Sequence, residues 1–421
     1  MIRTRRLLSI LDKLAKYRIF GWLGWAFLAI TVVSGAFMLW LMLDQDYIVL
    51  TGSLALRCAI GAATASQCHA GGYVVQPGPS LQAYLLLPGI NPFIPIVYGI
   101  IGIVLAVVIH EGTHGVLARS FKLPVKSTGV LLFLIVPIGA FVEIDEKLIQ
   151  KSRFRNSGRI MAGGPGSNII VALIALVLLL ALIGTLVPMQ FNGVYIGGVL
   201  SPSPAYNLYQ SHQIQPGDLI VAVNGTSVHS VSELSAYMAQ THPNQTLVLS
   251  ISHDGQISNH AITLGTNKIN STTTIGLIGV YQTESNTDLQ NIRNNYANAF
   301  FSKPLLYLIV PGIISQADQV VPFSNALHGF YTSPTLGSYW YPAALTLFWI
   351  WFINVNLAFF NAIPLYPLDG GQAMLNFFTH FGKKWVEIRA KAITTAISLA
   401  MFAIIVSFLF LPRILGLIPL G

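Results

Sequence analysis

Charged side chains are scarce in this sequence of 421 residues. Asp, Glu, Lys and Arg together make up 9% of it, whereas hydrophobic residues make up 53%, and the mean hydropathy is +0.64. A water-soluble protein of this length needs many more charged residues on its surface, so the composition excludes a soluble enzyme or binding protein. It is typical of a chain that crosses a membrane several times.

Cysteine is also nearly absent. The two cysteines, Cys58 and Cys68, lie ten positions apart in a segment that we expect to be exported. On the oxidising side of a membrane they form either a disulfide or two free thiols, and the sequence leaves both open.

The formal net charge is +8. In a membrane protein the location of basic residues matters more than their sum, and we expect a lipid bilayer and no nucleic acid as partner.

Long apolar runs define the expected membrane spans. Five runs are long enough to cross a bilayer as helices, and they cover approximately residues 19–43, 92–119, 160–187, 342–363 and 392–411. The apolar stretch 128–142 is too short for a span and contains Gly and Pro, so we expect a membrane-level strand or re-entrant β-hairpin. Residues 300–341 are interpreted as interfacial or re-entrant. The predicted fold is a polytopic α-helical membrane protein with five or six spans.

Basic residues cluster in three of the segments between these runs. Residues 1–18, 119–159 and 383–391 hold eighteen of the 23 Lys and Arg residues. Because loops rich in Lys and Arg stay in the cytoplasm, we expect an uncleaved first span with a cytoplasmic N-terminus. The same rule places residues 44–91 and 191–266 on the exported side of the membrane.

One polar motif stands at the end of the second apolar run, His-Glu-Gly-Thr-His at residues 110–114. On a helix, His110 and His114 lie one turn apart on one face, so two imidazoles can bind one metal ion while Glu111 stands beside an activated water. The alternative is a helix end where polar residues meet water. Such residues are costly in lipid unless they face a polar cavity or a metal, so we interpret the motif as the centre of a zinc hydrolase.

A catalytic zinc ion usually takes three protein ligands, so this motif needs one more. Asp369 is the best candidate, because a carboxylate at the end of a membrane span is costly unless it pairs or binds metal. The surrounding Leu-Asp-Gly-Gly alone is typical of a turn. The expected topology places it on the same side of the membrane as His110 and His114, which favours the metal site. His380 lies nearby in a basic stretch and is interpreted as a surface residue.

Residues 191–266 read as ordinary soluble protein. Strand-like runs at 219–223 and 247–251 alternate with Asn-Gly, Pro-Asn and Asp-Gly turn signals, and one helix is expected at 231–240. We therefore expect an inserted soluble α+β domain. We expect five divisions. Residues 1–91 form an N-terminal span and exported loop, and residues 92–190 form the first part of a membrane catalytic core. Residues 191–266 form the inserted domain, residues 267–341 a linker with an interfacial or re-entrant segment, and residues 342–421 the second part of the core.

Three motifs in combination resemble the site-2 protease family of intramembrane zinc metalloproteases. They are the 110–114 motif, the small-residue motif Gly164-Pro165-Gly166-Ser167-Asn168, and Asn361-x-x-Pro364 leading to Leu368-Asp369-Gly370. The resemblance covers residues 92–188 and 342–411. It implies that one Zn²⁺ per chain is bound by His110, His114 and Asp369, with Glu111 as general base. It also implies that Asn168 and Asn361 hold substrate or stabilise the oxyanion.

The inserted domain resembles a PDZ domain of the bacterial protease type. In that resemblance Tyr195, Ile196 and Gly197 form the carboxylate-binding loop, whereas residues 213–215 depart from the family pattern. The resemblance implies regulated intramembrane proteolysis of membrane-spanning substrates. We expect an integral protein of the cell membrane, and the distribution of basic residues places its active site towards the cytoplasm.

Two other functions compete with this interpretation. A non-catalytic membrane scaffold that captures peptides through its PDZ-like domain predicts an incomplete catalytic set, and this set is complete. A metal-dependent transporter predicts polar residues at several depths in several spans, whereas here they collect near one face. The sequence leaves the substrate, the activating signal and the oligomeric state undetermined.

Overall fold

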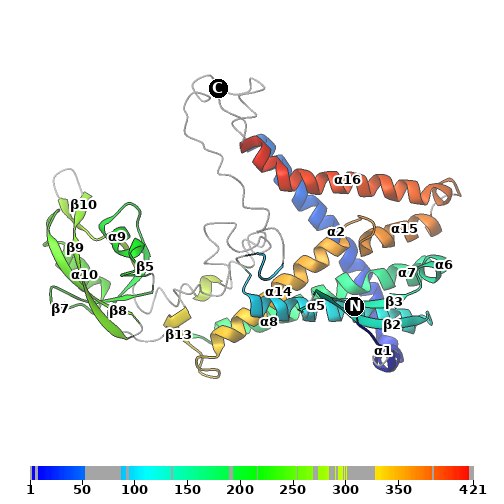
Figure 1. The fold of residues 1–421 in the computed structure, drawn as a ribbon, viewed down its shortest axis with the longest axis horizontal. Helices are drawn as coiled ribbons and strands as arrows, with labels where there is room; N and C mark the ends of the chain where they lie inside the picture. Colours follow the sequence, from blue (N-terminus) through cyan, green and yellow to red (C-terminus); the bar gives the residue numbers. More distant parts are fainter. Residues whose placement is uncertain are drawn as a thin grey trace, which may run out of the picture. The chain divides into compact units, whose positions relative to one another are not determined.

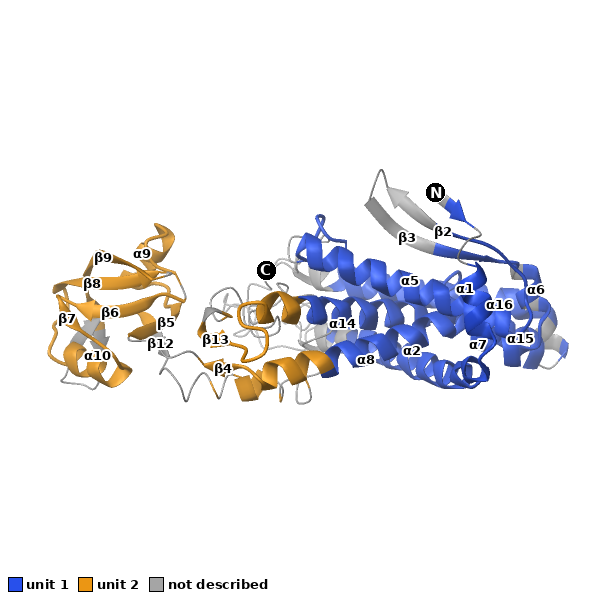
Figure 2. Cartoon of the chain, turned by 90° about the horizontal axis from the view of Figure 1, so that it is seen from below, with its two compact units in different colours: residues 1–177, 346–421 blue, residues 178–345 orange. Residues whose placement is uncertain are grey.

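The fold is taken from a computed structural model. It describes residues 2–4, 8–52, 87–91, 94–133, 136–188, 193–215, 217–253, 255–268, 274–283, 290, 293–296, 298, 300, 328–381 and 384–416. The chain forms two compact units, residues 1–177 with 346–421, and residues 178–345 (Figure 2). The first unit is therefore interrupted in sequence by the second.

Five helices in the described part of the chain are long and apolar enough to cross a membrane. They are residues Arg18–Asp44 within α2 (Arg18–Gly52), α5 (Ile96–Ser120), α8 (Gly163–Gly184), α14 (Trp340–Ala362), and Ile388–Leu411 within α16 (Lys384–Gly416) (Figure 1). They coincide with the five apolar runs. The prediction of a polytopic helical membrane protein is confirmed.

Among its described residues, the first unit also contains four shorter helices: α1 (Leu8–Ala15), α6 (Glu146–Lys151), α7 (Phe154–Met161) and α15 (Asp369–Phe381). Each buries at least one residue in the interior of the unit. Leu11 of α1, Ile149 of α6 and Ile160 of α7 pack with Leu117 of α5 in one hydrophobic cluster. This cluster fixes the short helices around the last turns of α5, where the histidine motif lies.

Glycines at the start of α8 let this helix approach two others. A Cβ atom on Gly166 would lie 2.5 Å from the Cβ of Phe27 in α2. A Cβ atom on Gly163 would lie 2.7 Å from the Cδ1 of Leu117 in α5. A larger residue at Gly166 would collide with the backbone of α2, whereas one at Gly163 would have to displace the end of the Leu117 side chain. Such a close approach is expected for a small-residue motif at a contact between membrane helices.

A three-stranded antiparallel sheet packs on α5. Its order is β1 (Ile2–Thr4), β2 (Val125–Phe133) and β3 (Val136–Ile144). The apolar stretch that we expected to be extended therefore forms two paired strands, with Thr128 opposite Val142. Among the described residues β1 covers the outer edge of β2, whereas β3 pairs on one side only.

The second unit contains a six-stranded sheet in the order β12-β5-β6-β8-β9, with β7 paired to β6. The strands are β5 (Val194–Val199), β6 (Leu219–Val223), β7 (Thr226–Ser227), β8 (Thr246–His253), β9 (Gln256–Thr263) and β12 (Val280–Thr283). Helices α9 (Pro204–Gln210) and α10 (Val231–Met238) accompany them. The predicted strands at 219–223 and 247–251 and the predicted helix are confirmed.

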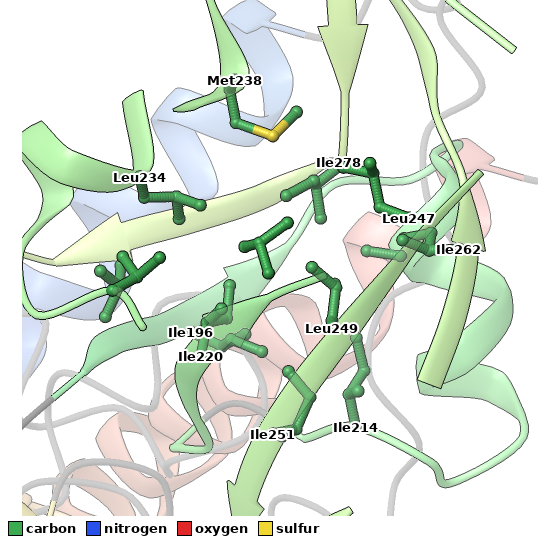
Figure 3. Packing of buried hydrophobic residues seen from close by; sticks show 14 of the residues in the cluster. Ile196, Ile214, Ile220, Leu234, Met238, Leu247, Leu249, Ile251, Ile262 and Ile278 are labelled. Carbon is green, nitrogen blue, oxygen red and sulfur yellow. The ribbon is translucent and has the colours of Figure 1, made fainter. Parts of the chain in front are cut away.

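A hydrophobic core holds this sheet together. Alternate residues of β8, Leu247, Leu249 and Ile251, point to one side and meet Leu234 and Met238 of α10 (Figure 3). The turn between β6 and β7 uses Asn224 and Gly225, both with positive φ (48° and 78°). This is the hairpin geometry that an Asn-Gly pair favours.

Part of the segment expected to be a linker is ordered. Strand β12 pairs with β5, so the sheet extends beyond the expected boundary at residue 266. The described part of this unit also contains short elements: β4 (Val187–Pro188), β10 (Gly265–Lys268), β11 (Thr274–Leu277), the 3₁₀ helix η2 (His328–Phe330) and β13 (Tyr331–Thr332). Cys58, Cys68 and residues 301–327 lie outside the described residues.

The segment expected to be a carboxylate-binding loop is a strand instead. Tyr195, Ile196 and Gly197 lie within β5, which pairs with β6 on one side and β12 on the other. Tyr195 and Ile196 are fully buried. The run of β-branched and aromatic residues around these positions favours a strand over a loop. A peptide-binding role for this segment remains a prediction.

Candidate metal centre

His110 and His114 lie on the buried face of α5. The four-residue spacing brings their rings together, with centroids 4.9 Å apart. Each side chain is 8% exposed. The helix therefore presents two imidazoles to the interior of the first unit, away from lipid.

Asp369 comes to these histidines from the other half of the first unit. It is the first residue of α15, and its Oδ2 lies 2.9 Å from Nε2 of His110 and 3.2 Å from Nε2 of His114. Two glycines after it allow this approach, because a Cβ on Gly370 or Gly371 would collide with the backbone of residues 362 and 365. The structure thus brings together the three residues that the sequence predicts as metal ligands.

Hydrogen bonds orient both imidazoles. Nδ1 of His114 lies 2.6 Å from the carbonyl oxygen of Ile160, so this nitrogen carries the proton and Nε2 has a free lone pair. Nδ1 of His110 lies 3.3 Å from the amide of Asn168, whose Oδ1 has no hydrogen-bond donor among the described residues. If the Oδ1 and Nδ2 positions of the Asn168 amide are exchanged, Oδ1 accepts the Nδ1 proton of His110. This orientation leaves the Nε2 lone pair of His110 free.

Gly164 leaves space between the two histidines. A Cβ atom on it would lie 2.5 Å from Nε2 of His114 and would also collide with Nε2 of His110. The three ligand atoms lie within 4.8 Å of one another. Two imidazole nitrogens and one carboxylate oxygen are a donor set of catalytic zinc sites, which keep a fourth position for water or substrate. The residues fit one zinc ion.

Glu111 is not one of these three ligands. Its Oε2 accepts a hydrogen bond of 3.0 Å from the backbone amide of Val142 in β3. Because β3 is an edge strand among the described residues, this amide points away from β2 and towards α5. The carboxylate is therefore held between the ligand group and the edge of the sheet.

The two predicted asparagines differ in their surroundings. Asn168 is fully buried against His110, whereas Asn361 donates its Nδ2 to the carbonyl of Leu357 one turn earlier in α14, at 3.0 Å. Their roles towards substrate remain predictions. The contacts of His114 with Ile160 and of Glu111 with Val142 were not predicted, because a backbone carbonyl or amide carries no residue-type signal in a sequence.

Comparisons with known proteins agree with this geometry. The sequence profile of peptidase family M50 matches residues 98–405. An uncharacterized protein of Methanocaldococcus jannaschii is 25% identical over 371 residues, 88% of this chain and 75% of that protein.

Two further relatives carry protease names. The zinc metalloprotease RasP of Geobacillus kaustophilus is 23% identical over 214 residues, which are 50% of this chain and 47% of that protein. The membrane-bound transcription factor site-2 protease homolog of Arabidopsis thaliana is 29% identical over 140 residues, 33% of this chain and 26% of that protein. The chain thus spans less than half the length of either named protease.

Proposed function

This chain belongs to peptidase family M50, the site-2 protease family, and from this premise we propose that it is a zinc metalloendopeptidase of the site-2 type. Its substrate is a membrane protein, cut within or next to a membrane-spanning segment in regulated intramembrane proteolysis. The observation that supports this most is that Asp369 of α15 meets His110 and His114 of α5, a candidate membrane helix that also carries Glu111.

The zinc ion and the side chains of the protein contribute different parts of the hydrolysis. When bound, zinc polarises the scissile carbonyl and increases the acidity of water. Glu111 accepts the proton of the attacking water and later transfers it to the leaving amine. The Val142 amide keeps the Glu111 carboxylate in place, while the Ile160 carbonyl and Asn168 keep the two imidazoles in place.

The substrate must reach this site as an extended chain. A membrane-spanning helix satisfies its own backbone, so it has to unwind before a carbonyl is exposed to attack. We place the unwound segment at membrane level along the outer edge of β3, by strand addition. Two observations support this edge: β1 already covers the outer edge of β2, and the β3 edge carries the amide that contacts Glu111.

The inserted domain has a separate role in this proposal. Its sheet lies in the second unit, whereas all three candidate ligands and Glu111 lie in the first. We propose that it is PDZ-like, lies on the exported side, and screens the exported ends of substrates before cleavage. The distribution of basic residues supports this placement, with the metal centre towards the cytoplasm.

Two variants test the proposal because they separate ligand from base. Asp369→Ala removes one of three protein ligands, so zinc content and activity should both fall. Glu111→Gln removes the base and leaves the ligand group, so zinc content should stay near normal while the cleavage rate falls about 10²- to 10⁴-fold. The measurements are zinc per chain by atomic emission and cleavage of a membrane-spanning test peptide in detergent.

Cleavage by Glu111→Gln at the parent rate would refute the protease mechanism and favour the non-catalytic scaffold. Full zinc in Asp369→Ala would instead show that the third ligand is another residue. A parent chain that binds zinc but cuts no membrane-spanning peptide would refute the substrate class alone.

A further inference from the structure

A second polar site lies in the first unit, separate from the metal centre. It is a pocket of about 450 Å³ between the end of α1, the start of α2, and α7. The residues that line it are Ala15, Lys16, Tyr17, Arg18, Gly21, Trp22, Trp25, Ser120, Arg155 and Arg159. Four of these ten residues are cationic and none is acidic. We propose that this pocket binds the phosphate group of an anionic phospholipid.

Arg159 is the most buried of the four cations that line the pocket. Its side chain is almost fully buried, and it donates hydrogen bonds to the Gly21 carbonyl at 2.8 Å and to Oδ1 of Asn156 at 2.9 Å. Its guanidinium also lies 5.0 Å from the ring centre of Trp25. All of these partners are neutral, so the buried positive charge has no opposite charge beside it. Burial lowers the pKa of Arg159, and the like charge of Arg155 lowers it further.

Two described carboxylates near these helices are already paired with other cations. Asp12 lies 3.2 Å from Arg119, and Asp145 lies 3.2 Å from Lys126. None of the ion pairs formed by the described residues includes Lys16, Arg18, Arg155 or Arg159. A cluster of like charges with no internal counterion is stabilised by an external anion.

The position of the pocket identifies the source of that anion. Arg18 begins the first candidate membrane span, and Trp22 and Trp25 lie in its first two turns with 75% and 43% of their surface exposed. Tryptophan at the end of a span lies at the level of the lipid head groups. Basic pockets at that level bind anionic head groups, and the guanidinium fork fits phosphate oxygens.

This site takes no part in peptide hydrolysis, so the proposal does not depend on the proposed function. In this proposal, helices that surround the metal centre bind a lipid at the membrane surface. The chain would therefore distinguish membranes by their content of anionic lipid.

The test is a titration of the full chain in detergent, with bound lipid counted by native mass spectrometry. Phosphatidylglycerol, phosphatidylcholine and inorganic phosphate are the three ligands. The parent should bind phosphatidylglycerol more tightly than phosphatidylcholine. The double variant Arg18→Gln with Arg155→Gln removes two exposed cations of the pocket and should weaken phosphatidylglycerol binding about thirty-fold.

Lys147→Gln is the matched control, because Lys147 is an exposed cation on α6 that does not line the pocket. It should bind phosphatidylglycerol like the parent. The single variant Arg155→Gln, which should weaken binding about five-fold, replaces the double variant if that one fails to fold. Unchanged affinity in the folded variants, or equal loss in Lys147→Gln, would overturn the site. Displacement of phosphatidylglycerol by equimolar inorganic phosphate would overturn its assignment to lipid.

Discussion

At the scale of single residues, Gly164 decides whether the two imidazole nitrogens have room for an ion. It lies in α8, yet its missing side chain faces Nε2 of both His110 and His114. Gly112 offers a comparison, since it lies in the histidine motif itself and a Cβ there would meet nothing within 4 Å. A side chain at Gly164 would thus collide with the histidines, whereas a side chain at Gly112 would have space.

Gly164→Ala should therefore weaken zinc binding about tenfold or more, because the added methyl group occupies the space between the histidines and the packed helices resist displacement. Gly112→Ala should leave zinc binding unchanged and favour the helix by about 1 kcal/mol. Zinc affinity measured against a competing chelator checks both variants. Equal affinities would show that the ion does not lie beside Gly164.

Residue types alone predicted much of this centre. Two histidines four positions apart and a carboxylate at a span end are costly inside a membrane unless they pair or bind a metal ion. The groups that orient them could not be predicted. The Ile160 carbonyl and the Val142 amide are backbone groups, and nothing in a sequence distinguishes them from the backbone groups of other residues. Asn168 was predicted, but its contact with His110 depends on how α8 packs against α5.

At the scale of secondary-structure elements, β3 lies between the helix that carries Glu111 and the surface where we place the substrate. Its Val142 amide serves Glu111, and the side chain of Val142 packs into the cluster around α5. Different substitutions at Val142 test the role of the amide and the role of the side chain separately.

Val142→Pro removes the amide proton, a change that an edge strand tolerates. Loss of a hydrogen bond to a charged group costs about 1.5–3 kcal/mol, so peptide cleavage should slow about ten- to a hundredfold while zinc content is kept. Val142→Ala is the control, because it shortens the side chain and keeps the amide. If both variants cleave at the same rate, the amide has no role in holding Glu111.

The extended character of this region could be predicted from its length, its Gly and Pro residues and its β-branched content. The presence of β1 could not, because three residues carry too little pattern and pair with a strand more than 120 positions away. The same limit applies to β12, which joins the sheet of the inserted domain from a segment with the composition of a linker.

At the scale of the whole molecule, the distribution of basic residues predicts which parts face the cytoplasm. A chain with Cys58→Ser and Cys68→Ser provides a background without thiols. Ser227→Cys, exposed in β7, should react with a membrane-impermeant thiol reagent in intact cells. Lys147→Cys, exposed in α6, should react only after lysis. The opposite labelling pattern would reverse the topology.

The apolar runs predicted the five long helices found among the described residues, because a span needs about 20 apolar residues. The division into two units was harder to predict. Its boundaries fall inside α8 and α14 rather than in loops, since both helices continue beyond the first unit.

The interrupted first unit also sets an order of events during synthesis. His114 and Asp369 are 255 positions apart, with the whole second unit encoded between them. A ribosome that has finished the histidine helix must still make that unit and α14 before the third ligand exists. The nascent protein therefore carries two of the three candidate ligands while the whole second unit is made, and its metal centre stays incomplete until Asp369 has been added.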